Sequence, residues 1–374
     1  LGIDVSAYTV EHAWRVSDGT AHDIEWKNPS PVYGHTEKVR AQLDDTGFLS
    51  LSRQLDAPVH QPSGTWRSLN DARGALLIAS VAALYVFGLL VLVRSRRWSL
   101  VGRRLPIALS AGLAIGFLLT TLDSDGIVGN MALLAVSVLL AGGALPSIAG
   151  VVAWLKQGSA VRVHGAEQLV AGRFRSPAAA ASLLVGAASG AVLALVMVAH
   201  NAAALRVPGF APAVGSEIGL ASPGFYTAFG PWLALAVAIG LAIAFMYELP
   251  SRFLRRPWLA LALIVLIASP LAADVQAGGW PLLLSSVTAG LIIAVLMVSY
   301  ASRGLGAVLV AVLFWQLLQH LVAARSLGGA VAGSRGTVML TVAVVAIAVG
   351  IWSYAGDRMK AGVDTLSSKS GIRP

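Results

Sequence analysis

Nine runs of apolar residues fill most of the chain beyond residue 70. Each run is close to the roughly 20 residues that a helix needs to cross a bilayer. Because a lone strand in lipid could not satisfy its backbone groups, each run predicts a helix. The pattern therefore predicts an all-α polytopic membrane bundle of about nine transmembrane helices. The runs are 74–93, 105–122, 127–154, 177–199, 225–247, 257–273, 280–300, 304–324 and 337–355.

The third run, 127–154, is longer than an ordinary span and contains Gly142, Gly143 and Pro146. Proline and paired glycines are common sites of helix kinks, and a long span can also tilt. Two interpretations stay open: one tilted, kinked helix, or a helix followed by a short re-entrant piece.

Residues 1–70 have a different pattern, with polar and apolar residues alternating as in β-strands. Segments 38–43 and 48–52 flank the turn Asp44-Asp45-Thr46-Gly47 and predict a hairpin. Segment 8–16 alternates in the same way, and 57–70 has the Pro, Ser and Gly content of a linker. We expect a small N-terminal β-rich domain outside the membrane (1–70 with its linker), a transmembrane helical domain (74–355) and a cytoplasmic tail (356–374).

Composition agrees with a membrane protein, since 56% of the residues are hydrophobic and only 12% are charged. The mean hydropathy is +0.75. Soluble domains carry about a quarter charged residues, so that class is excluded. The net charge of +9 sits mainly in short loops, which indicates contact with the lipid bilayer and no nucleic-acid partner.

The chain has no cysteine, which excludes disulfides and thiolate metal sites. We expect no metal and no cofactor.

Orientation follows from the placement of lysine and arginine. Alternate loops and the tail hold 17 of these residues on one side, whereas the opposite loops hold three: Arg206, Arg325 and Arg335. The asymmetry predicts a protein of the cell inner (plasma) membrane with the N-terminal domain outside and the C-terminus in the cytoplasm. An external domain must be exported, so we expect a signal sequence or a further membrane helix upstream of Leu1.

Ionisable residues within or beside the spans are the natural candidates for chemistry. Few exist, and none of the nine runs has a carboxylate near its middle, which counts against an ion-coupled transporter. Glu248 and Arg252 are four residues apart, a spacing that lets the two side chains meet on one helix face. The alternative interpretation is that Glu248 simply ends a helix and Arg252 belongs to a basic anchor at the membrane surface. His200 and His320 lie toward the opposite membrane surface.

Segment 247–258, Tyr-Glu-Leu-Pro-Ser-Arg-Phe-Leu-Arg-Arg-Pro-Trp, resembles the first motif, Glu-Glu-x-x-x-Arg, of the CAAX-protease and bacteriocin-processing (CPBP) family of intramembrane proteases. The resemblance implies a long family member with an extracytoplasmic N-terminal region. In that family paired glutamates activate a water, assisted by histidines on two later helices. Here Tyr247 replaces the first glutamate, and neither 260–273 nor 307–314 contains a histidine.

The resemblance therefore implies a degenerate site with Glu248 and Arg252 as the candidate catalytic residues. We expect a non-catalytic binding or scaffold protein, a pseudo-enzyme whose partner is a membrane or lipidated protein or peptide. One alternative is an active intramembrane endopeptidase that uses Glu248, which would need another acid, His or Asn within hydrogen-bond reach. Another is a permease-like subunit for a hydrophobic substrate, which would need a continuous polar cavity.

Overall fold

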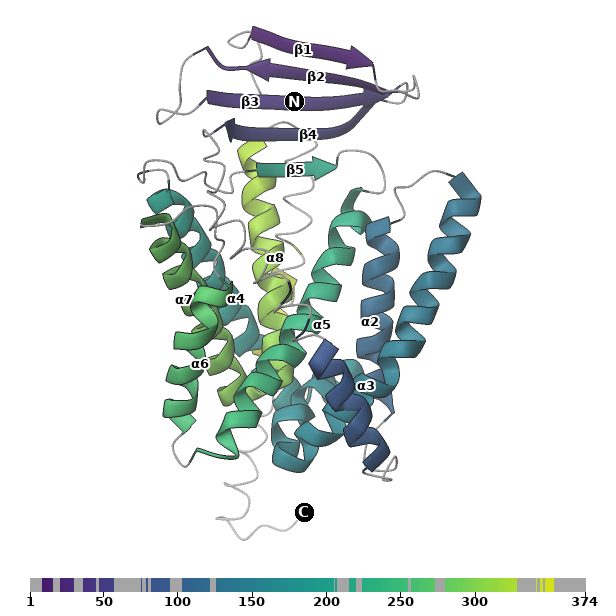
Figure 1. The fold of residues 1–374 in the computed structure, drawn as a ribbon, viewed down its shortest axis with the longest axis vertical. Coiled ribbons are helices and arrows are strands. Elements are labelled where there is room, and N and C mark those ends of the chain that lie inside the picture. The colour runs from purple at the N-terminus through teal and green to yellow at the C-terminus, as the bar shows by residue number, and fades with distance from the viewer. Residues whose placement is uncertain are drawn as a thin grey trace, which may run out of the picture.

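The computed structural model consists mostly of helices, with an antiparallel sheet lying across one end of the helical bundle (Figure 1). The structure describes residues 9–15, 21–29, 36–44, 47–56, 75, 79, 82–94, 103–121, 126–204, 206, 215–219, 224–254, 257–272, 280–327, 341, 344, 345 and 347–352. The expected linker at 57–70 and the tail at 356–374 lie outside these residues.

The helices follow the apolar runs closely. They are Ala82–Arg94, α2 (Arg104–Thr121), α3 (Gly126–Val170), α4 (Pro177–Ala204), α5 (Gly224–Ser251), α6 (Pro257–Ala272), α7 (Trp280–Arg303) and α8 (Leu305–Leu327), and residues 347–352 are also helical. Three described helices are long and apolar enough to cross a membrane, judged by length and composition: Pro177–Ala204, Trp232–Ser251 and Leu282–Arg303. The apolar helices Ala82–Arg94, Arg104–Leu118 and Leu305–Leu321 are shorter.

The third apolar run, 127–154, lies within helix α3. It is helical through Gly142, Gly143 and Pro146, so the run 127–154 forms one continuous helix rather than a helix and a separate piece. The helix also continues beyond the apolar run to Val170. Its regular geometry breaks once, at Ser159, where the backbone is extended (φ −158°, ψ 89°). The break separates the first part of α3, which contains the apolar run, from the segment 160–170.

The sheet has five antiparallel strands in the order β1-β2-β3-β4-β5. The predicted hairpin is confirmed as β3 (Thr36–Asp44) and β4 (Gly47–Asp56), and the alternating segment near the N-terminus is β1 (Thr9–Arg15). Two strands were not predicted from the sequence: β2 (Ala21–Lys27), between β1 and β3, and β5 (Gly215–Gly219). Because β5 comes from the segment between α4 and α5 and pairs with β4, the sheet is joined to the bundle by backbone hydrogen bonds.

The two faces of the sheet differ as the alternation predicts. On one face Arg40 makes two hydrogen bonds to Asp23, and Lys38 lies within ion-pair distance of Glu11 (3.2 Å) and Glu25 (2.9 Å). The opposite face carries Val39 and Ala41, which are both buried. These five charged residues are therefore paired with one another across the strands.

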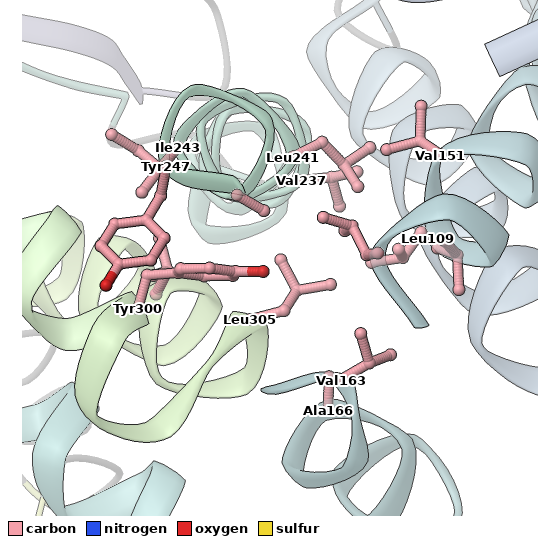
Figure 2. Packing of buried hydrophobic residues seen from close by; sticks show 14 of the residues in the cluster. Leu109, Val151, Val163, Ala166, Val237, Leu241, Ile243, Tyr247, Tyr300 and Leu305 are labelled. Atoms are coloured by element: carbon pink, nitrogen blue, oxygen red, sulfur yellow. The ribbon is translucent and has the colours of Figure 1, made fainter. Parts of the chain in front are cut away.

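Helix α8 packs against α3, α4, α5 and α7, and much of its first half is buried. Figure 2 shows Leu305, the first residue of α8, together with buried residues of the neighbouring helices. Helix α8 crosses α4 at very short range because Gly186 and Gly190 have no side chains. A Cβ at Gly190 would lie 2.7 Å from the carbonyl oxygen of Ala311, and one at Gly186 would lie 2.7 Å from that of Ala307. The glycine spacing in α4 is thus a helix-packing feature.

Candidate functional site

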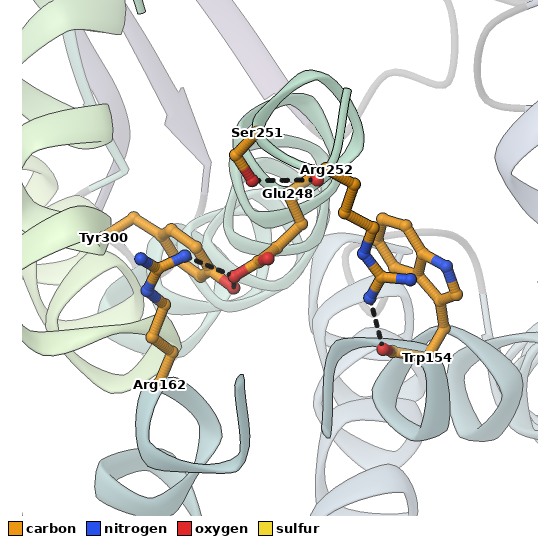
Figure 3. A network of polar contacts seen from close by, with 6 residues as sticks. All are labelled: Trp154, Arg162, Glu248, Ser251, Arg252 and Tyr300. Carbon is orange, nitrogen blue, oxygen red and sulfur yellow. Dashed lines mark hydrogen bonds and ion pairs between the residues drawn. The ribbon is translucent and has the colours of Figure 1, made fainter. Parts of the chain in front are cut away.

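Glu248 lies in the last turn of α5, at the end of the bundle opposite the sheet, and only 3% of its surface is exposed. Its Oε1 atom accepts a hydrogen bond from Nη1 of Arg162 at 2.7 Å and another from the hydroxyl of Tyr300 at 3.1 Å (Figure 3). Arg162 comes from α3 and Tyr300 from α7. One carboxylate therefore joins three helices.

Aromatic rings enclose this ion pair. The guanidinium carbon of Arg162 lies 4.8 Å from the ring centre of Tyr247 and 5.8 Å from that of Tyr300. The two tyrosine rings contact each other, with centres 5.4 Å apart. Cation–π attraction is stronger where water is excluded, so the rings add to the Coulomb attraction between Arg162 and Glu248.

The backbone around Gly304 lets Arg162 reach this position. Gly304 has φ +74° and directly follows α7, and its amide donates to the carbonyl of Tyr300 at 2.7 Å. A Cβ at Gly304 would lie 1.8 Å from the carbonyl oxygen of Arg162, so the two backbones touch. Glycine is required here both for the left-handed conformation and for the close approach.

Arg252 has a different partner from the one that its spacing suggested. Its Nη2 atom donates to the backbone carbonyl of Trp154 at 2.9 Å, and its guanidinium carbon lies 3.9 Å from the centre of the Trp154 ring. In the described part of the chain, the ion pair of Glu248 is with Arg162. Gly158 lies beside both side chains, because a Cβ there would be 2.5 Å from Nη2 of Arg252 and 3.3 Å from Oε2 of Glu248.

The two histidines considered from the sequence lie away from Glu248. The ring of His320 contacts Trp232, near the opposite end of α5 from Glu248, with centres 5.1 Å apart. His200 Nδ1 lies 2.8 Å from the hydroxyl of Thr288 on α7. Among the described residues, the hydrogen-bond donors at Glu248 are therefore an arginine and a tyrosine rather than a histidine or an asparagine.

Arg162 and Tyr300 were not predicted as site residues. Arg162 could have been noticed because it stands between two valines, Val161 and Val163. The segment that carries Arg162 follows the break at Ser159, and the pair Gly158-Ser159 is typical of helix kinks, so a signal for the break was present in the sequence. Tyr300 was treated only as the end of an apolar run.

Helices α4 and α7 also share polar contacts. In addition to His200 and Thr288, the hydroxyls of Ser299 and Ser189 lie 2.7 Å apart. On α7 these two contacts are separated by the apolar stretch 289–298. The permease alternative stays a prediction.

No family model, curated protein or solved structure matches the chain. The resemblance to CPBP proteases thus rests on segment 247–258, and catalytic roles for Glu248 and Arg252 stay predictions.

Proposed function

We propose that the chain is a multi-pass protein of the inner (plasma) membrane, with about nine spans, the sheet outside and the C-terminus in the cytoplasm. The distribution of basic residues over the bundle supports this orientation. Of the lysines and arginines that the structure describes in the helical part, nine belong to the Glu248 end of the bundle and two, Arg206 and Arg325, to the sheet end. The nine are Arg94, Arg103, Arg104, Lys156, Arg162, Arg173, Arg175, Arg252 and Arg303.

The outward faces of the helices support a membrane location. On α6 the side chains of Leu263, Leu266 and Ile267 are exposed, with 74% of Leu266 open to the surroundings. On α4 Val192, Leu195 and Val198 are exposed in the same way. Apolar faces of this extent are expected where lipid chains cover the protein.

For the function itself, we propose a non-catalytic binding or scaffold protein for a membrane or lipidated protein or peptide. The observation that carries the proposal is the pairing of Glu248 with Arg162 and Tyr300. A general base must accept a proton from a bound water. Here Oε1 already accepts two hydrogen bonds, one of them from a cation, and the carboxylate is buried among helices that it holds together.

A peptidase assay in proteoliposomes tests the proposal. The parent and the Glu248→Gln variant are incubated with fluorogenic transmembrane peptides, with Arg173→Gln as a control at an exposed arginine of the same bundle end. We expect the same background cleavage in all three. Cleavage present in the parent and in Arg173→Gln but lost in a folded Glu248→Gln protein would support the endopeptidase alternative and refute the scaffold.

A further inference from the structure

Arg252 is a cation that the Glu248 site does not use. Because Arg162 neutralises Glu248, Arg252 at the end of α5 has no carboxylate partner among the described residues. The side chain is exposed, yet it is held in one place by the carbonyl and the ring of Trp154 (Figure 3). An unpaired guanidinium held in a fixed orientation is suited to bind an anion from outside the chain.

The support for Arg252 is itself rigid. Trp154 is 8% exposed and packs against two phenylalanines, with ring centres 5.3 Å from Phe87 and 5.5 Å from Phe245. One Nη atom of Arg252 is bonded to the Trp154 carbonyl, which leaves the other guanidinium N–H groups for a ligand. The planar array of donors matches the oxygens of a phosphate group, and little side-chain entropy remains to be lost on binding.

The surroundings of Arg252 favour a lipid over a soluble anion. The next residue, Phe253, is 79% exposed, and Trp258 at the start of α6 is 60% exposed. Aromatic side chains beside arginines are typical of the level of the lipid headgroups, where the ring enters the acyl boundary and the cation meets the phosphates. A site for a free anion would gain nothing from an exposed phenylalanine.

We propose that Arg252, positioned by Trp154 and flanked by Phe253, binds the phosphate of an anionic phospholipid in the membrane leaflet on the Glu248 side of the bundle. The site deepens the proposed function, because it rests on the membrane location and names a lipid partner. It gives Arg252 a role separate from the hydrolytic one that its motif suggested.

Native mass spectrometry of the full chain in detergent tests the site. Phosphatidylglycerol, phosphatidylcholine and inorganic phosphate are titrated separately into the parent and into Arg252→Gln, Arg252→Lys and Arg303→Gln. Arg303 is the matched control, since it is exposed at the same end of the bundle. We expect phosphatidylglycerol to bind the parent best, with about fivefold loss in Arg252→Gln, as expected for one arginine near an anionic lipid surface.

Arg303→Gln should lose less than twofold, and Arg252→Lys should bind more weakly than the parent because it keeps the charge but not the planar donors. If Arg252→Gln does not fold, the lipid affinity of Arg252→Lys relative to the parent tests the proposal. Equal losses in Arg252→Gln and Arg303→Gln, full affinity in Arg252→Lys, or inorganic phosphate binding as tightly as the lipid would each overturn the proposal. Such a result would leave the membrane topology intact, because cysteine labelling tests the topology independently.

Discussion

The guanidinium of Arg162 lies 2.7 Å from the carboxylate of Glu248, which is 86 residues further along the chain. This pair fastens segment 160–170 to the ends of α5 and α7. Val163 and Ala166 of the same segment are buried, so the ion pair and the apolar contacts act on one short piece of helix. Loss of the Arg162–Glu248 ion pair should therefore loosen the packing at that end of the bundle.

Removing one partner of the pair should destabilise the protein strongly, because the other charge stays buried and unpaired. We expect Arg162→Gln to lower the free energy of unfolding by about 3 kcal/mol, the lower end for a buried pair because the Arg162 side chain is 29% exposed. The double variant Arg162→Gln/Glu248→Gln should recover part of that loss. Denaturant unfolding in detergent measures all variants, with Arg173→Gln unchanged as the control. Additive losses in the double variant would show that the two residues are not coupled.

Alanine variants of the two glycines with positive φ can distinguish the cost of backbone strain from the cost of a steric clash. Gly172 has φ +68° and open space around it, whereas Gly304 has φ +74° and lies against the carbonyl of Arg162. Gly172→Ala should cost only the strain of the left-handed conformation, about 1–2 kcal/mol. Gly304→Ala adds a backbone clash and should lower the melting temperature well beyond Gly172→Ala. Equal melting temperatures for the two variants would mean that the close contact between Gly304 and Arg162 does not affect stability.

Replacing a helical glycine by alanine should stabilise the protein at Gly142 and destabilise it at Gly190. A Cβ at Gly142 would meet nothing within 4 Å, so Gly142→Ala should stabilise the protein by up to about 1 kcal/mol through helix propensity. A Cβ at Gly190 would lie 2.7 Å from the carbonyl oxygen of Ala311, so Gly190→Ala must separate α4 from α8 and should destabilise. Unfolding curves of the two variants and the parent give the sign of each change in the free energy of unfolding. A stabilising Gly190→Ala would contradict the close crossing.

Sequence periodicity predicted the helices and the β3–β4 hairpin because both depend on local patterns. The apolar runs end where charged residues begin, as at Arg104 and Arg303, and these residues lie at helix ends in the structure. Strand β2 also alternates, through Asp23, Ile24 and Glu25, so a signal for it was present. Strand β5 had none, because Gly-Ser-Glu-Ile-Gly becomes a strand only by pairing with β4, which is distant in the sequence.

The site was harder to predict than the fold. The spacing of Glu248 and Arg252 allowed a pair on one helix face, but a helix surface does not reveal competing partners on other helices. Arg162 competes successfully because the break at Ser159 and the close approach at Gly304 bring it to the carboxylate. Arg252 instead meets the ring of Trp154, a contact that also depends on tertiary packing.

The charged face of the sheet should respond to acid. The hydrogen bond from Lys38 lowers the pKa of Glu11 below its ordinary value of 4.5. A lowered pKa means that the pair stabilises the folded sheet above pH 4.5, and that this contribution is lost as the pH falls through the pKa of the folded state. Nuclear magnetic resonance of glutamate-labelled protein should give a midpoint for Glu11 below 4.5. Lys38→Gln should raise that midpoint, and an unchanged midpoint would show that Lys38 is not the cause.

Single cysteines can test the orientation because the chain has none of its own. Val10 on β1 and Ala202 at the end of α4 are exposed at the sheet end, whereas Val161 and Ser302 are exposed at the end of the bundle that holds Glu248. With the sheet outside, a membrane-impermeant maleimide should label Val10→Cys and Ala202→Cys in intact cells. Val161→Cys and Ser302→Cys should react only after lysis. Labelling of Val161→Cys in intact cells would reverse the topology, and with it the leaflet to which Arg252 is assigned.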